Sequence, residues 1–101
     1  MHREEDIYEW AKARNLLGPN GKASPLAQHD KTVEEVRELL DGIKTGNLDE
    51  IRDAIGDVYV TLCIQAAMWN LGMDECVDAA WEQIKDRKGK LVNGQFVKDQ
   101  P

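Results

Sequence analysis

The sequence predicts an all-α domain of four helices with a short extended tail at its C-terminal end. Apolar residues recur at spacings of three and four over several stretches, which is the pattern of an amphipathic helix. Turn-forming residues interrupt these stretches at residues 18–21, 42–47, 71–72 and 93–94. With 101 residues, 42% of them hydrophobic, the chain is expected to form one domain over residues 1–101 with a modest core.

The first two helices are predicted from apolar residues that share one side of a helical wheel. The first is expected over roughly residues 4–17, and it ends before a Gly-Pro turn. Its apolar side comprises Ile7, Trp10, Ala11 and Leu17. The second is expected from near Pro25 to about Ile43. Its apolar stripe comprises Val33, Val36, Leu39, Leu40 and Ile43.

The third helix, expected from Leu48 to Leu71, should be the most enclosed, because residues 58–64 are apolar on nearly every side. The β-branched residues in that run make a strand the competing prediction, but the stripe that begins at Ile51 favours a helix. The fourth helix should run from Asp74, a good N-cap, to about Lys88. A short extended or hairpin tail follows, with Asn93-Gly94 as its turn.

Six carboxylates gather within 24 residues of the second and third helices: Glu34, Glu35, Glu38, Glu50, Asp53 and Asp57. Glu35 and Glu38 lie beside the apolar stripe on the wheel, and Gln28 and Lys31 extend the same polar ridge. The three acidic residues of the third helix share another face. Two acidic ridges are therefore expected to confront each other, and the repulsion between them favours a bound cation.

Asp57 lies where the third helix changes from exposed to enclosed, and a carboxylate that enters a core requires a partner. Hard oxygen ligands suit Mg²⁺ or Mn²⁺, and Mg²⁺ keeps positions for water and phosphate oxygens. Phosphate chemistry is therefore the leading functional class. Gly56 inside a helix costs about 1 kcal/mol relative to alanine, which suggests close helix approach or room beside the metal. The alternative is that the glutamates simply form a solvated helix face.

Charge and composition limit the classes of partner. The net charge of −6 argues against a general binder of nucleic-acid polymers or anionic membranes. Residues 84–101 carry an excess of bases, whereas the rest of the chain is acidic. Cys63 and Cys76 read as reduced core residues without metal-ligand spacing. The charged start and the absence of a long apolar run predict a cytoplasmic protein.

Three motifs, in this order and spacing, resemble the MazG-like, all-α nucleoside triphosphate pyrophosphohydrolase family. They are Lys31-x-x-Glu34-Glu35-x-x-Glu38, the run Asp53-Ala54-Ile55-Gly56-Asp57-Val58, and residues 80–90, which read AWEQIKDRKGK. Together they cover about residues 28–98 and look most like the small phage-type members. The resemblance implies a four-helix, MazG-like bundle completed by oligomerisation. The homo-oligomer is expected to be a tetramer or a dimer.

The resemblance also implies an activity, which is Mg²⁺-dependent hydrolysis of a nucleoside triphosphate to the monophosphate and pyrophosphate. A deoxynucleotide substrate and a role in nucleotide-pool housecleaning are expected on the same ground. The family's metal-binding carboxylates correspond to Glu35, Glu38 and Asp57. Glu34 would position water or metal, and either Glu34 or Glu38 would act as the base.

The resemblance implies further contacts between basic or polar side chains and the substrate. Lys31 and Lys85, with Arg87 or Lys88, would meet the phosphates. Gln28 would make a polar contact to the nucleotide. Trp10, Trp69 and Trp81 fall at core spacings, and Trp10 is the best candidate for stacking on a base.

One departure from the family pattern concerns Ala54, which occupies the position of a metal-binding glutamate. Asp53, one turn before Asp57, is the preferred replacement, and Glu82 on the fourth helix is the other candidate. The departure also permits a non-catalytic helical oligomer that binds nucleotide or another protein without turnover. Metal-dependent release of pyrophosphate would distinguish the enzyme from that alternative.

Overall fold

The computed structural model describes residues 3–100, which form four helices and a β-hairpin. In chain order the elements are α1 (Glu4–Ala13), α2 (Pro25–Thr45), α3 (Leu48–Met68), α4 (Met73–Ile84), β1 (Gly89–Val92) and β2 (Gln95–Lys98). The two strands pair antiparallel, with Leu91 opposite Phe96. The mostly helical architecture and the hairpin tail are therefore as the sequence predicts.

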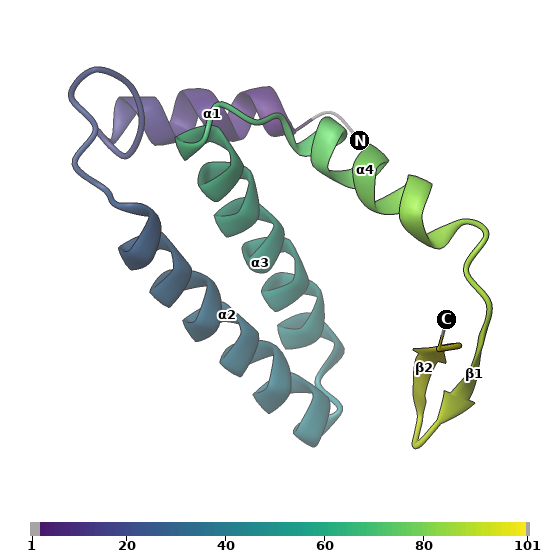
Figure 1. The fold of residues 1–101 in the computed structure, drawn as a ribbon. Coiled ribbons are helices and arrows are strands. Elements are labelled where there is room, and N and C mark those ends of the chain that lie inside the picture. The colour runs from purple at the N-terminus through teal and green to yellow at the C-terminus, as the bar shows by residue number, and fades with distance from the viewer. Residues whose placement is uncertain (1–2, 101) are drawn as a thin grey trace.

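The long helices α2 and α3 run side by side as an antiparallel pair (Figure 1). Gly46 ends α2 in the left-handed region, with φ of 66°, which a glycine adopts without strain. Asn47 then caps α3, because its side-chain oxygen accepts the N–H of Glu50 at 3.1 Å. A Cβ at Gly42 would lie 3.1 Å from Cγ1 of Ile51, so the two helices are in close contact near this turn.

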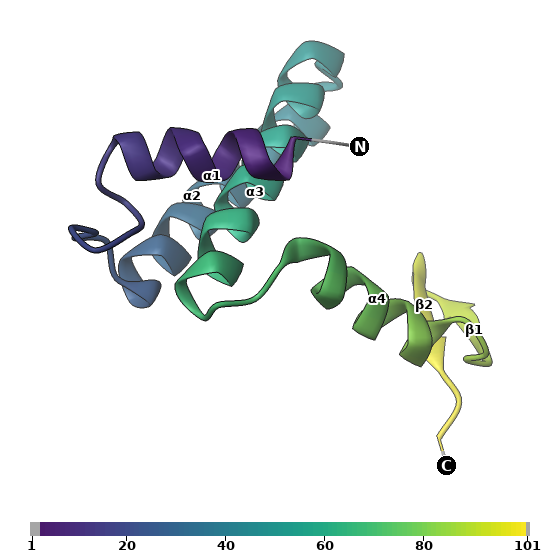
Figure 2. The same ribbon diagram turned by 90° about the horizontal axis from the view of Figure 1, so that it is seen from above.

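Helix α3 is the central element, because α1, α2 and α4 all contact it (Figure 2). Its buried residues are Ala54, Thr61, Cys63, Ile64 and Ala66. From the neighbouring helices, Ala11 of α1 and Gln28, Glu35 and Gly42 of α2 are also buried. The enclosed position predicted for this helix is confirmed in its second half, whereas Ile55 remains 56% exposed.

The observed helix ends correct several predicted boundaries. α1 stops at Ala13 rather than near Leu17, because Asn15 adopts a positive φ of 60°. Asn70, with φ of 57°, similarly follows the end of α3 at Met68. The N-cap of α4 is Gly72 rather than Asp74, and Glu75 accepts the Gly72 N–H at 2.9 Å. This helix also ends at Ile84, before the basic residues.

Helix α4 and the hairpin form an arm, residues 73–98, that leads away from α2 in both views (Figures 1 and 2). None of the residues of α4 is buried, and every hairpin residue is exposed. The predicted core position of the tryptophans is wrong. Trp10, Trp69 and Trp81 are 46%, 62% and 56% exposed, because few side chains of the same chain cover these positions.

The extended arm gives the chain an open shape. The radius of gyration is 16.1 Å, whereas a compact domain of 100 residues has about 13 Å. Three of the five residues in the apolar stripe predicted for α2 are also uncovered, since Val36, Leu40 and Ile43 are each about half exposed. A single chain therefore leaves apolar surface open on both the α2–α3 pair and the arm.

No helix within residues 3–100 has the length and hydrophobicity needed to cross a membrane. Cys63 is buried and Cys76 is half-buried, and both are free thiols. The core position predicted for Cys63 is confirmed, whereas Cys76 lies on the partly open α4.

Candidate functional site

Helix α2 brings Glu34, Glu35 and Glu38 together on one side. The Ser24 hydroxyl caps the start of this helix by accepting the Ala27 N–H at 3.1 Å, and Pro25 occupies its first turn. The helical spacing then places one carboxylate oxygen of each glutamate within 4.8 Å of the others. Glu34 and Glu38 are exposed and Glu35 is buried.

Glu35 is the unusual member of this cluster, because its residue is only 7% exposed. One of its carboxylate oxygens lies 3.4 Å from the Lys31 ammonium. The other, Oε2, is buried without a hydrogen-bond partner among the described residues. A buried polar atom that lacks a partner costs free energy, so this oxygen marks a position where a ligand would stabilise the protein.

Asp57 faces the cluster from α3. Partial burial raises the pKa of the Asp57 carboxyl above its ordinary 3.8, and the charges of Asp53 and Glu35 raise it further. Hydrogen bonding with Glu35 raises the pKa of Glu38, and the charge of Glu35 adds to that effect. The carboxylates of Asp57 and Glu35 therefore repel each other across α3 and α2, whereas the group of oxygens within 4.8 Å includes no residue of α3.

A divalent cation fits this donor set. The donors are all carboxylate oxygens, which suit Mg²⁺ or Mn²⁺. The unpartnered oxygen of Glu35 and the mutual repulsion in the cluster would both be relieved by a positive charge. Lys31 supplies the one ammonium that contacts the cluster among the described residues, at 3.4 Å from both Glu34 and Glu35.

A hollow of about 350 Å³ adjoins the carboxylates on the side of α2. Its lining combines Glu35, Asp57 and Lys31 with polar Gln28 and Thr61 and apolar Leu16, Val60 and Ile64. Gln28 is fixed there because its Nε2 donates to the Thr61 carbonyl at 3.3 Å. Thr32 donates to the Thr61 hydroxyl at 2.9 Å, which ties α2 to α3 behind the hollow.

Two further hollows meet Asp57 on the side of α1. One, of about 370 Å³, is lined by Trp10, Arg3, Asp6, Ile7, Asp57 and Val60. The other, of about 520 Å³, contains Asp53 and Asp57 together with Arg3, Arg52 and Gly56. The structure thus places Asp53 beside Asp57, and it brings Trp10 to the same region, where Arg14 stacks 4.3 Å from the ring centroid.

Sequence reasoning missed Arg3, Arg52, Leu16 and Thr61 as lining residues. The two arginines form ordinary ion pairs with an acidic residue three positions away, so their local pattern carries no sign of a site. Leu16 follows the end of α1, where only the fold of the connecting segment sets its position.

Of the basic residues predicted to bind phosphate, only Lys31 contacts the carboxylates within the described chain. Lys85, Arg87 and Lys88 follow α4, and none of the three lines the hollows around Asp57. Glu82 pairs with Lys85 at 2.8 Å on the arm instead of lying at the carboxylate cluster. Gly56 also has no close helix neighbour, because a Cβ there would meet nothing within 4 Å.

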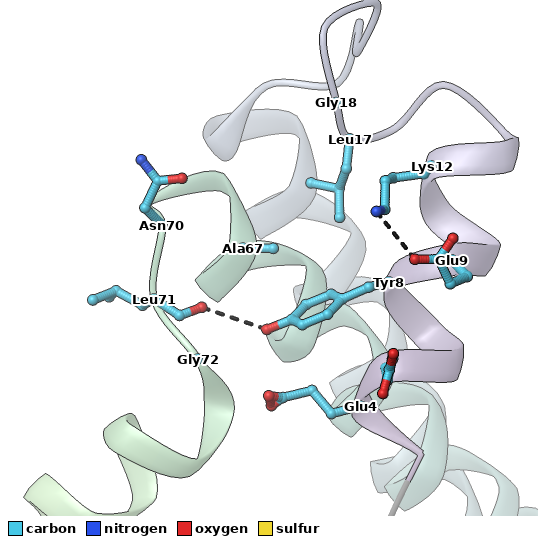
Figure 3. A pocket seen from close by; sticks show the side chains of 11 residues that line it. Glu4, Tyr8, Glu9, Lys12, Leu17, Gly18, Ala67, Asn70, Leu71 and Gly72 are labelled. Atoms are coloured by element: carbon cyan, nitrogen blue, oxygen red, sulfur yellow. Dashed lines mark hydrogen bonds and ion pairs between the residues drawn. The ribbon is translucent and has the colours of Figure 1, made fainter.

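A larger hollow, of about 810 Å³, lies between α1 and the α3–α4 corner (Figure 3). Tyr8 donates to the Leu71 carbonyl at 3.5 Å, and Lys12 pairs with Glu9 at 3.1 Å. Glu4 accepts the Met73 N–H, which anchors the start of α4. None of the predicted site residues lines this hollow, so its volume does not identify the site.

Comparison with known proteins assigns the motifs to a family. The MazG nucleotide pyrophosphohydrolase domain matches residues 23–92, which include the whole α2–α3 pair and α4. This chain belongs to the MazG family. The resemblance predicted from the three motifs is thereby confirmed, and the carboxylate cluster lies inside the matched region.

Two proteins with similar sequences differ from the chain in length. An uncharacterized 18.2 kDa protein in the rep-hol intergenic region of Haemophilus phage HP1 is 37% identical over 62 residues, which cover 61% of this chain and 36% of the relative. A protein of Mycolicibacterium smegmatis named nucleoside triphosphate pyrophosphohydrolase is 27% identical over 71 residues, 64% of this chain and 22% of that protein. The matched region therefore spans about a third of the length of the phage protein and about a fifth of the length of the mycobacterial protein. No solved structure matches.

Proposed function

We propose that this protein hydrolyses a nucleoside triphosphate to the monophosphate and pyrophosphate with bound Mg²⁺ or Mn²⁺. The observation that carries the proposal is the buried, unpartnered Oε2 of Glu35 in a cluster with Glu34 and Glu38. Membership of the MazG nucleotide pyrophosphohydrolase domain family supports the reaction class. A deoxynucleotide substrate and a role in nucleotide-pool housecleaning are further parts of the proposal.

Glu35, Glu38 and Asp57 would hold the cation, and Asp53 would supply the carboxylate absent at Ala54. Asp53 is preferred to Glu82 because it lines a hollow with Asp57, whereas Glu82 pairs with Lys85 on the arm. When bound, the cation would neutralise phosphate oxygens and favour attack by water. Lys31 contacts the cluster and would provide a positive charge to the phosphates from the same chain.

The chain's own carboxylates provide the acid–base chemistry. Water would form a bond to the α phosphorus while the bond to the bridging oxygen breaks, and the electron pair leaves with pyrophosphate. Glu38 or Glu34 would take the proton from water.

The arm is proposed to act between chains. The basic Lys85, Arg87 and Lys88 belong to the arm, which leads away from α2 (Figure 1), and both the arm and the α2–α3 pair leave apolar side chains exposed. In a homodimer or tetramer the arm of one copy would cover the other copy's apolar surface and add positive charge near its acidic site.

The test is to measure pyrophosphate and orthophosphate released from a panel of ribo- and deoxyribonucleoside triphosphates, with Mg²⁺, with Mn²⁺ and with chelator. We expect equal amounts of monophosphate and pyrophosphate, only with a divalent cation. Binding of nucleotide without release of pyrophosphate would instead support the alternative of a non-catalytic relative, in which Ala54 marks the lost ligand.

Variants then test the site itself. Glu38→Gln and Asp57→Asn should each lower kcat/KM by at least about 100-fold, because a metal-binding carboxylate is lost. Asp53→Asn should raise the Mg²⁺ concentration needed for activity. If Glu82→Gln raises it more, Glu82 rather than Asp53 is the replacement ligand. Asp78→Asn, an exposed carboxylate on α4, is the matched control. Unchanged rates for both Glu38→Gln and Asp57→Asn would reject the site.

A further inference from the structure

This inference rests on the proposed function, in which the substrate extends from the carboxylates in two directions. Hydrolysis between the α and β phosphates places the α phosphorus at the carboxylates. The nucleoside must then extend to one side and the leaving pyrophosphate to another. Asp57 and Val60 line hollows on both the α2 side and the α1 side, so the structure offers a separate space for each part.

The α2-side hollow suits a nucleoside. Leu16, Val60 and Ile64 provide apolar surface, and Gln28 provides a polar amide held in place by Thr61. Bound bases and other small organic groups usually occupy such mostly apolar spaces with a few fixed polar groups. Lys31 is the one base that lines this hollow, which leaves little positive charge there for two further phosphate groups.

The α1-side hollow has a different chemistry. Arg3 and Arg52 are among its lining residues, and its wall at Gly56 is bare, with no atom within 4 Å of the position of a Cβ. Arginine presents several N–H donors in a planar fork, which matches phosphate oxygens. At about 520 Å³ the hollow is also the larger of the two.

The charge balance of this hollow depends on a bound cation. Asp49, Asp53 and Asp57 also line it, so the two arginines alone leave a net charge of −1. A divalent cation held by Asp53 and Asp57 would change the net charge to +1. The hollow would therefore attract an anion only together with the cation, as a metal–pyrophosphate complex requires.

The arginines are available for a new partner. Arg3 pairs with Asp6 and Arg52 with Asp49, each at 2.9 Å, and both arginine side chains are at least three-quarters exposed. Exposed pairs between residues three positions apart contribute little to stability. A phosphate group with two or three negative oxygens would compete with either aspartate.

We propose that the hollow between α1 and α3, lined by Arg3, Arg52 and Gly56, binds the β and γ phosphates of the substrate and the pyrophosphate product. The nucleoside occupies the hollow lined by Leu16 and Gln28 on the other side of Asp57. Arg3 and Arg52 are thus substrate-binding residues that act from the same chain as the carboxylates, in addition to any cations from another copy.

The test uses inorganic pyrophosphate as the probe, with binding to the full chain measured by calorimetry in the presence of Mg²⁺. Arg3→Gln and Arg52→Gln should each weaken pyrophosphate binding on the order of tenfold, as expected for the loss of a hydrogen bond between charged groups. The affinity for the monophosphate product of the best substrate should stay unchanged. Lys12→Gln is the control, because it removes the same charge and a similarly spaced ion pair from the side of α1 that lines the separate 810 Å³ hollow.

The outcomes separate this inference from the proposed function. Triphosphate turnover by the wild type, together with unchanged pyrophosphate affinity in the double variant Arg3→Gln/Arg52→Gln, would overturn the inference and leave the function standing. An equal loss of monophosphate affinity would also overturn it, because the arginines would then act on the whole site. Absence of turnover in the wild type would reject the function, while pyrophosphate binding that depends on both arginines would still support the subsite.

Discussion

At the residue scale, the burial of the Glu35 and Asp57 carboxylates lowers the stability of the folded protein. Glu35 is buried with one oxygen unpartnered, and burial and neighbouring charges raise the pKa of Asp57. Both features oppose folding in the absence of a counter-charge. Stability lost at a functional site is common in natural proteins, because selection acts on function once the fold is stable enough.

The raised pKa of Asp57 predicts a pH dependence of stability. Because the folded protein holds this proton more tightly than the unfolded chain does, stability falls as the pH rises through the interval from the ordinary pKa of 3.8 to the raised value. Without divalent cation, Asp57→Asn should therefore unfold at higher urea concentration than the wild type at pH 7. The difference should vanish below about pH 3, where the wild-type carboxyl is protonated.

The comparison with Asp78→Asn shows whether this effect is specific to the site, since Asp78 is exposed on α4. Addition of Mg²⁺ should stabilise the wild type and leave Asp57→Asn nearly unchanged. A variant at Asp57 that is less stable than the wild type at pH 7 without cation would contradict the electrostatic interpretation.

At the element scale, Gly46 and Gly56 of the α2–α3 pair have opposite requirements. Gly46 ends α2 with a positive φ of 66°, whereas Gly56 lies inside α3 with open space around its Cα. The sequence marked Gly56 as exceptional because glycine lowers helix propensity. The structure shows that close helix contact is not the reason, since the close approach occurs at Gly42.

Gly56→Ala should raise the free energy of unfolding by about 1 kcal/mol, because alanine is the better helix former and the added methyl group meets no neighbour. Gly46→Ala should lower it by about 1 kcal/mol, since a Cβ is unfavourable at positive φ. Urea denaturation of both variants measures the two effects. A Gly56→Ala variant less stable than the wild type would mean that the space beside this glycine is filled in the native protein.

At the scale of the whole molecule, the arm exposes apolar side chains that no other part of the described chain covers. Val77, Trp81 and Ile84 are 54%, 56% and 48% exposed along one side of α4. The isolated hairpin adds exposed Leu91 and Phe96, and a two-stranded hairpin alone is only marginally stable. Contiguous exposed apolar surface of this kind usually marks a protein interface.

Light scattering after size-exclusion chromatography should therefore give a mass that is a multiple of 11.4 kDa. Trp81→Ser should shift the equilibrium toward the monomer, because it removes a large apolar contact from the interface. Gln83→Ala, on the other side of the same helix, should leave the mass unchanged. A wild type that stays monomeric at high micromolar concentration would contradict the proposed assembly.

The sequence by itself determined the helical class, the four helices, the hairpin turn at Asn93-Gly94 and the pairing of the acidic segments. These properties follow from local spacing and turn chemistry, which each segment carries independently of the others. It also determined the family, because the motifs are defined by residue order. The predicted ends of α1 and α3 rested on the Gly-Pro and Leu-Gly turns that follow, whereas asparagines with positive φ end both helices earlier.

Only the tertiary structure decided which carboxylate is buried, which hollows meet at Asp57, and where the basic residues lie. Glu35 is buried because α2 rests on α3 at that turn, and a helical wheel gives the angle of a side chain but not the position of the next helix. The placement of Arg3 beside Asp57, and of Lys85 away from it, depends on how α1 and α4 pack against α3. Packing between distant segments sets these distances, and no local pattern encodes it.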